Sequence, residues 1–233
     1  MASGLVHPIL LSTELGLDNL VINGQLVEFR HVFYTWVVLG LLIILGLFAK
    51  RRLKMVPTGT QNVLEALIGG LEDFVITNMG EVGRKFVPLL TGMFIFILGM
   101  NLIGFVPLFD APTANLNTAA SMAMIVFLYY NWLGLKRWGP KYIKHFTGPM
   151  PILIPLMLPL EILSNCARPV SLSFRLFGNL RGGEVVLLIF FGMAPLFSTL
   201  PVYFMFVLTK SLQAFIFFML TMVYIQGALD HAH

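Results

Sequence analysis

Ionisable side chains in the second half of this chain lie within its most apolar stretches. The segment SFRLFGNLRGGE, residues 173–184, carries Arg175, Arg181 and Glu184 between two apolar runs. A charged group inside a lipid bilayer costs several kcal/mol, and such groups commonly mark ion pathways. The residue types therefore favour the movement of ions over covalent chemistry.

The spacing of these residues predicts how a helix would present them. Glu161, Arg168 and Arg175 follow one another at intervals of seven residues, so in a helix they lie on nearly one stripe. Glu184 comes nine residues after Arg175, on the opposite side of such a helix and about 13 Å farther along its axis. Five small or amide residues flank or extend the stripe: Ser164, Ser171, Gly178, Asn179 and Gly182.

Two interpretations of this stripe are open. Serines and glycines often only let helices pack closely, and charges can pair within a bundle. The balance of charge favours a functional role, because only two acids, Glu161 and Glu184, share the apolar region with Arg168, Arg175, Arg181 and Lys210. The excess of positive charge predicts that a partner subunit supplies a negative group.

The composition identifies the class of protein that holds this stripe. Hydrophobic residues make up 58% of the 233 residues and charged residues only 11%, whereas soluble domains are about one quarter charged. The chain is therefore predicted to be a polytopic membrane protein. Its net charge of +4 comes largely from basic residues at the ends of apolar runs, which favours a role in orientation over nucleic-acid binding. The single cysteine, Cys166, excludes an internal disulfide and a multi-cysteine metal site.

The apolar runs predict an all-α fold with five crossings, one interfacial amphipathic helix and a long tilted helical hairpin at the C-terminal end. A crossing needs roughly 20 apolar residues for a ~30 Å hydrocarbon core. Residues 57–80 have apolar side chains at helical spacing beside acidic ones, so they are expected along the membrane surface. The single membrane domain, residues 1–233, divides into an external polar lead (1–27), the first crossing (28–50), the interfacial helix (57–80), the second and third crossings (86–136) and the hairpin (150–227).

The region Met150–Gly192 allows one helix or two. As a single helix it would be about 64 Å long, twice the hydrocarbon thickness. Two short crossings would place Arg168, Arg175 and Arg181 in an external loop, against the usual distribution of positive charge. We therefore predict one long, strongly tilted helix, kinked near Pro169, where a backbone hydrogen bond is missing.

The distribution of basic residues predicts the orientation. The loops on one side carry no lysine or arginine, apart from Arg30 at the border of the first helix. Basic loops face the cytoplasm, so the N-terminus is expected outside and the C-terminus inside. The basic loops contain Lys50, Arg51, Arg52, Lys54, Arg84, Lys85, Lys136, Arg137, Lys141 and Lys144.

Four motifs resemble one known family. RPVSLSFRLFGNLRGGE at residues 168–184 and SLQAFIFFMLTMVYI at 211–225 strongly resemble subunit a of F-type ATP synthases, and MNLIGFVP and PTANLNTAASMA resemble its motifs near the second and third crossings. The resemblance covers residues 25–227. It implies a stator subunit whose tilted hairpin faces a rotating ring of c subunits, each with one membrane-buried carboxylate. The other partners that it implies are subunit b of the peripheral stalk, the remaining ATP synthase subunits and membrane lipid. It implies neither a nucleic-acid partner nor a cofactor.

The resemblance also implies roles for individual residues. Arg175 corresponds to the essential arginine that separates two half-channels for protons, and Gln213 to a glutamine that faces it. Glu184 and Asn179 resemble residues of the outer half-channel, and Glu161 resembles one of the cytoplasmic half-channel. Ser171 and Lys210 complete the expected proton path. No metal site is expected.

The chain departs from the family pattern in two places. Many members pair the outer-channel acid with a histidine on the last helix, and the matching position here is Phe206, which cannot titrate. Lys210 lies one turn farther on, within a crossing. We expect a contact between Lys210 and Glu184 that tunes the outer channel; the alternative is a lysine that extends into an aqueous cleft.

The main alternative is a self-contained ion channel or secondary transporter. Such proteins often contain inverted repeats with paired broken helices, and the sequence has no internal repeat. It also lacks the HExxH and Gly-rich phosphate motifs of intramembrane or nucleotide enzymes, so ATP chemistry is assigned to other subunits and the chain is not expected to be an enzyme on its own. A bacterial inner membrane is the expected location, and the sequence leaves both H⁺ and Na⁺ open as the coupling ion.

Overall fold

The computed structural model describes residues 19–22, 25–51, 59–106, 109–139, 154–193 and 199–230. Most of the expected external lead and the final three residues lie outside these ranges. The described helices are α2 (Arg30–Arg51), α3 (Thr60–Met79), α4 (Val87–Ile103), α5 (Leu116–Trp138), α7 (Ile154–Met193) and α8 (Thr199–Asp230), with short 3₁₀ turns η1 (Glu81–Lys85) and η2 (Pro112–Ala114).

A small hairpin precedes the first helix. Strands β1 (Asn19–Ile22) and β2 (Gln25–Glu28) pair antiparallel with Asn19 opposite Glu28. Consecutive leucine, valine and isoleucine residues fill the strands (NLVI and QLVE), and β-branched residues are enriched in strands. The sequence analysis treated this segment only as a polar lead, so the hairpin is an addition to the expected all-α fold.

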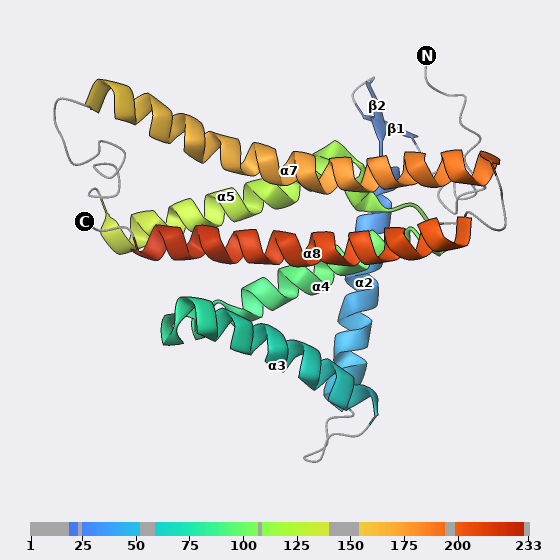
Figure 1. Cartoon of the computed structure of the whole chain (residues 1–233), viewed down its shortest axis with the longest axis horizontal. Helices are drawn as coiled ribbons and strands as arrows, with labels where there is room; N and C mark the ends of the chain where they lie inside the picture. The colour runs from blue at the N-terminus through green and yellow to red at the C-terminus, as the bar shows by residue number, and fades with distance from the viewer. Residues whose placement is uncertain are drawn as a thin grey trace.

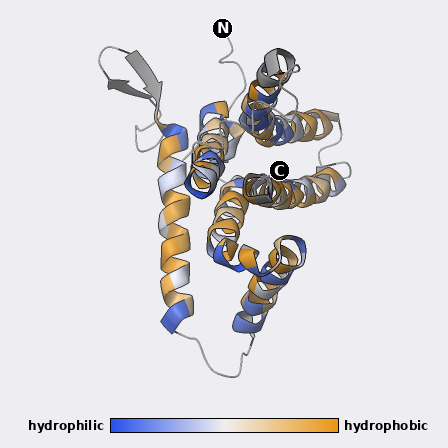
Figure 2. Ribbon diagram, turned by 90° about the vertical axis from the view of Figure 1, so that its left-hand side faces the viewer, coloured by the Kyte–Doolittle hydropathy of each residue, from blue (hydrophilic) through white to orange (hydrophobic). Residues whose placement is uncertain are grey.

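The helix lengths agree with a polytopic membrane protein. Among the described residues, four helices are long and apolar enough to cross a membrane: α2, α5, α7 and α8. The remaining expected crossing is α4, whose 17 residues extend about 26 Å, near the lower limit for a span. Figure 2 shows α2 as hydrophobic over most of its length, with hydrophilic residues at both ends.

The single-helix interpretation of this region is confirmed over its described part, residues 154–192. Helix α7 is continuous for 40 residues, through Pro159 and Pro169, and therefore extends about 60 Å. The helix is bent rather than straight (Figure 1), and the prolines inside it each remove an internal hydrogen bond. In both ribbon views α7 and α8 run across the direction of α2 (Figures 1 and 2). If α2 stands across the bilayer, the hairpin is strongly tilted, as its length requires.

The core lies between the hairpin and the two preceding helices. Helix α5 packs along α7, α4 packs against α8, and α7 and α8 pack against each other. The core is formed by fully buried side chains from all four helices, including Leu90, Ile97, Tyr130, Leu176 and Phe217. These contacts fix the rotation of α7 and α8, which decides where each polar side chain of the hairpin points.

Helix α3 has the expected amphipathic character. Its second half is anchored by the buried residues Leu71 and Val75, while Val63, Leu64 and Leu67 in the first half are exposed. Exposed apolar side chains on a helix with acidic neighbours are typical of a helix at a membrane interface.

Candidate functional site

Arg175 lies in the middle of an exposed side of α7. Its side chain is exposed, and within the described ranges it forms no ion pair or hydrogen bond. A Cβ added at Gly178 or Gly182 would meet no atom within 4 Å, so another helix could approach closely here. We call this surface the Arg175 face; its exposed members are Ser164, Ser171, Arg175, Gly178, Gly182, Val186 and Ile189.

The neighbouring side of α7 is packed against the rest of the chain. Leu172, Leu176 and Leu180 are at most 1% exposed and recur every four residues, which is one helical turn. Burial of these leucines turns the Arg175 face outwards. The arrangement explains how the charged guanidinium is kept out of the core of its own subunit.

Asn179 and Gln213 connect the two arms of the hairpin. Asn179 Nδ2 donates a hydrogen bond to Gln213 Oε1 over 3.0 Å. Gln213 is 1% exposed, and its buried Nε2 has no partner within the described ranges. The expected pairing of Gln213 with Arg175 is not among the hydrogen bonds of the described residues. Gln213 is instead bonded to Asn179, one turn farther along α7.

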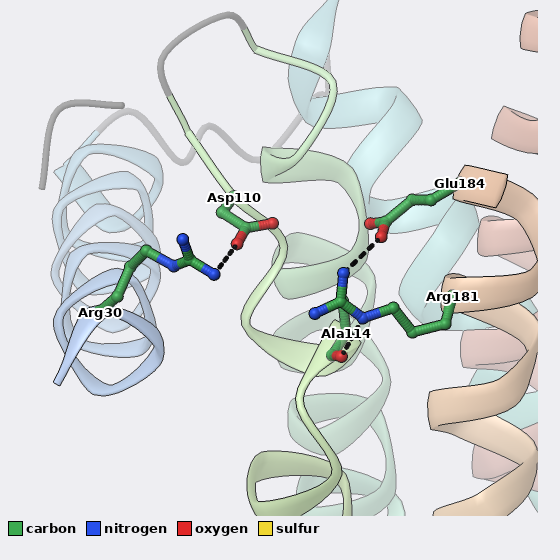
Figure 3. A network of polar contacts seen from close by, with 5 residues as sticks. All are labelled: Arg30, Asp110, Ala114, Arg181 and Glu184. Carbon is green, nitrogen blue, oxygen red and sulfur yellow. Dashed lines mark hydrogen bonds and ion pairs between the residues drawn. The ribbon is translucent and has the colours of Figure 1, made fainter. Parts of the chain in front are cut away.

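Glu184 belongs to a cluster of charged residues around η2, shown in Figure 3. Arg181 Nη1 donates to Glu184 Oε2 at 3.2 Å, and Arg181 Nε donates to the carbonyl oxygen of Ala114 at 3.0 Å. On the other side of η2, Arg30 Nη2 and Asp110 Oδ2 form an ion pair at 3.3 Å. We call these residues, together with Lys210, the η2 cluster.

Lys210 is enclosed by aromatic rings. The residue is 3% exposed, and its Nζ lies 4.5 Å from the centre of the Phe105 ring and 4.3 Å from that of Phe206. Cations are attracted to the faces of such rings, and the attraction grows when water is excluded. The ion-pair partner of Glu184 is Arg181. The expected contact between Lys210 and Glu184 is absent from the ion pairs of the described residues, although the two charges act on each other at longer range.

A buried hydrogen-bonded chain holds Lys210 at the level of η2. Asn101 Nδ2 donates to the backbone oxygen of Lys210 over 3.0 Å, and Thr113 Oγ1 donates to Asn101 Oδ1 over 2.8 Å. Asn101 and Thr113 are fully buried. Since buried polar groups must be paired, this chain fixes α4, η2 and α8 relative to one another.

Arg168 and Glu161 lie nearer the start of α7. The Arg168 guanidinium carbon is 5.9 Å from the Tyr130 ring centre and 5.4 Å from that of Tyr224. Tyr130 Oη also donates to Asn165 Oδ1 over 2.6 Å. Arg168 thus joins α5, α7 and α8, which supports a structural role. Glu161 is half-buried and has no contact with the other candidate site residues among the described interactions.

Comparison with known proteins identifies the family. The model of the ATP synthase A chain family matches residues 32–226. The chain belongs to this family. Proteins named ATP synthase subunit a from Nitratidesulfovibrio vulgaris and Oleidesulfovibrio alaskensis are 64% and 58% identical to it, each over 100% of both chains. A subunit a of Trichlorobacter lovleyi is 46% identical over 98% of this chain and 100% of its own length.

The family match runs from α2 into the last turns of α8, so it includes all of α7 and most of α8. The departure at Phe206 has a structural counterpart. A Cβ added at Gly183 would overlap the Phe206 ring, so glycine is needed for the ring to pack against α7. The ring in turn covers Lys210. Phe206 therefore shapes the surroundings of the η2 cluster without titrating.

Sequence reasoning missed Asp110, Arg30, Asn101 and the Ala114 carbonyl as parts of this site. Two signals were available. Asp110 is the only acid in the segment LFDAPTANLN, and Arg30 is the only cation at the predicted external border. Opposite single charges on the same side of a membrane favour an ion pair, although no local pattern connects residues that are 80 positions apart.

Proposed function

We propose that the chain is the proton-conducting stator of an F-type ATP synthase and that Arg175 separates the two half-channels of its proton path. The carrying observation is that Arg175 lies exposed on the Arg175 face, without a carboxylate partner among the described residues. A permanent cation in an apolar setting calls for an anion from another subunit. The carboxylates of the c-subunit ring are that anion.

The chemistry of arginine supports this role. A guanidinium stays protonated at any accessible pH, so it cannot relay a proton itself. It attracts an approaching carboxylate and favours release of the proton that the acid carries. A ring acid passes Arg175 only in its ionised form and enters lipid only in its neutral form. Proton flow is thereby coupled to rotation, with about 2.3 kcal/mol per charge for each 100 mV of membrane potential.

The polar residues of the hairpin form the two half-channels. Glu184, held by Arg181 on the side of α7 towards η2, exchanges protons in the outer half-channel. The Asn179–Gln213 bond lies between this acid and Arg175 along α7, and Lys210 tunes the charge around Glu184. Glu161 belongs to the cytoplasmic half-channel, and Ser171 lies on the Arg175 face beside the ring.

The orientation follows from the charges at the helix ends. The last turns of α2 and α5 carry Lys50, Arg51, Lys136 and Arg137, and the usual excess of positive charge in cytoplasmic loops supports a cytoplasmic location for these turns. The η2 cluster is then periplasmic, as are the N-terminus and the loop between α4 and α5, and the C-terminus is cytoplasmic. The location is a bacterial inner membrane. Subunit b and the catalytic subunits, which carry out the ATP chemistry, complete the complex.

Substitution of two arginines on the same helix tests this function. In the assembled complex, we expect Arg175→Ala to abolish ATP-driven proton pumping while the catalytic head still hydrolyses ATP. Arg168→Ala is the matched control, because Arg168 lies two turns earlier on α7 and is stacked on tyrosines; it should pump more than Arg175→Ala when assembly is equal. Normal pumping by Arg175→Ala would contradict the proposal.

A further inference from the structure

Asp110 lies in a loop that is anchored from three directions. Gly104, after the end of α4, packs so closely that an added Cβ would lie 2.9 Å from the Cβ of Ala111. Thr113 is bonded to buried Asn101, and the Ala114 carbonyl accepts a hydrogen bond from Arg181. These contacts fix the Asp110 carboxylate relative to α7 and α8.

Asp110 and Glu184 are each bonded through one oxygen. Asp110 Oδ2 pairs with Arg30 and Glu184 Oε2 pairs with Arg181. Within the described ranges, no group donates a hydrogen bond to Asp110 Oδ1 or Glu184 Oε1. Figure 3 shows Asp110 between Arg30 and the Arg181–Glu184 pair, with its second oxygen turned away from Arg30. Both acids therefore keep an oxygen that can accept a proton.

Lys210 connects the two acids electrostatically. The charges of both Asp110 and Glu184 act on the Lys210 ammonium, and Asp110 also acts on Glu184. Charges that are shielded from water influence one another over longer distances than exposed ones. Asp110 lies in the segment between α4 and α5, and its side chain is 16% exposed, against 26% for that of Glu184 on the hairpin.

We propose that Asp110 is a second proton-exchanging carboxylate of the outer path, ahead of Glu184, and that Arg30 is its positioning residue. The proposal rests on the function proposed above for Glu184. The groups that face Asp110 are Arg30 from α2, Arg181 and Glu184 from α7, and Lys210 from α8. The two guanidinium groups keep their protons at any accessible pH, so the two acids are the groups that we assign to proton exchange.

The proton is accounted for at each step. A proton from the periplasm bonds to Asp110 Oδ1 and neutralises that carboxylate. The new O–H bond then breaks, and the proton passes through water to Glu184 Oε1, which leaves Asp110 ionised again. Glu184 delivers the proton to a ring carboxylate and returns to its ionised form. No electrons are exchanged, and each acid ends the cycle as it began.

A purely structural role for Asp110 predicts different results. In that case the Arg30–Asp110 ion pair only ties α2 to the loop, so loss of either partner should have the same effect. Exchange of the two residues should then restore function, because the ion pair is kept. In the proton-exchange role, the exchange moves the carboxylate to α2, away from Lys210 and Glu184, and function is not restored.

The experiment uses the complete ATP synthase, reconstituted in liposomes, with proton pumping measured per ATP hydrolysed and assembly checked by subunit content. The variants are Asp110→Asn, Asp110→Glu, Arg30→Gln and the exchanged pair Arg30→Asp with Asp110→Arg. Asp73→Asn, an exposed acid on α3, is the control for loss of a carboxylate elsewhere. Glu184→Gln reports separately on the proposed function.

We expect Asp110→Asn to lower pumping at least tenfold, Asp110→Glu to retain a third or more, and Arg30→Gln to lose less than Asp110→Asn. The exchanged pair should remain as low as Asp110→Asn; if it does not assemble, the comparison of Asp110→Asn with Arg30→Gln decides. Three results would each overturn the inference. Asp110→Asn and Arg30→Gln could lose pumping equally, or the exchanged pair could recover pumping. The third is pumping by Asp110→Asn within twofold of the unmodified complex. If Glu184→Gln pumps normally, the assignment of Glu184 to the outer path is wrong. If Glu184→Gln loses pumping and Asp110→Asn does not, only the proposed role of Asp110 is excluded.

Discussion

Gly183 provides a quantitative test of how the hairpin is packed. Its Cα lies against the Phe206 ring, and a methyl group at residue 183 would overlap two ring carbons and lie 3.0 Å from a third, Cζ. The ring cannot turn aside freely, because it also packs edge-on against Phe105 at a centroid distance of 5.6 Å and contacts the Lys210 ammonium. Gly183→Ala should therefore destabilise the hairpin.

The expected size follows from three terms. Forcing an extra methyl group into a packed site costs about 1–3 kcal/mol, and displacement of the ring from Lys210 loses about 0.5–2 kcal/mol of cation–ring attraction. Alanine favours the helix over glycine by about 1 kcal/mol, which offsets part of this. A net loss of about 2 kcal/mol would lower the unfolding temperature by roughly 4–8 °C for a chain of this size.

The assay is thermal dissociation of the chain from the detergent-solubilised complex, at one heating rate because such unfolding is irreversible. Gly46→Ala on α2 is the matched control, since an added Cβ there meets no atom within 4 Å; it should be neutral or slightly stabilising. In the Phe206→Ala background, Gly183→Ala should lose most of its effect, with a coupling energy of about 1–3 kcal/mol. A stable Gly183→Ala complex, or an effect that does not depend on Phe206, would refute the reasoning.

Two further substitutions test the buried polar contacts. Asn101→Ala leaves the Thr113 hydroxyl without its buried acceptor and should cost about 1–3 kcal/mol, measured as a lower dissociation temperature. Asn117→Ala is the control, because Asn117 lies at the exposed start of α5; it should lower the dissociation temperature less. Tyr130→Phe removes the hydrogen bond to Asn165 but keeps the ring. We therefore expect a smaller loss of stability, about 0.5–1.5 kcal/mol, with proton pumping retained. A complete loss of pumping would contradict a structural role for that bond.

Much of the fold was predictable because membrane insertion imposes simple local rules. The length of each apolar run, the amphipathic pattern of α3 and the positions of basic residues follow from the thickness and polarity of a bilayer. The continuity of α7 was predictable because two short crossings would have placed three arginines on the wrong side. The β1–β2 hairpin was missed because its strands are only four residues long, too short for a clear pattern.

The sequence by itself determined which residues share a side of α7, because helical geometry fixes the angle between positions on one helix. It therefore placed Arg175 and Ser171 together and separated Arg175 from Glu184. The same geometry brings Glu184 near Arg181, three residues earlier, and Lys210 near Phe206, four residues earlier. Only the tertiary structure decided the contacts between segments: Asp110 with Arg30, Lys210 with Phe105, and Arg181 with the Ala114 carbonyl. Those contacts depend on how α2, α7 and α8 pack around the segment between α4 and α5, which no spacing along the chain records.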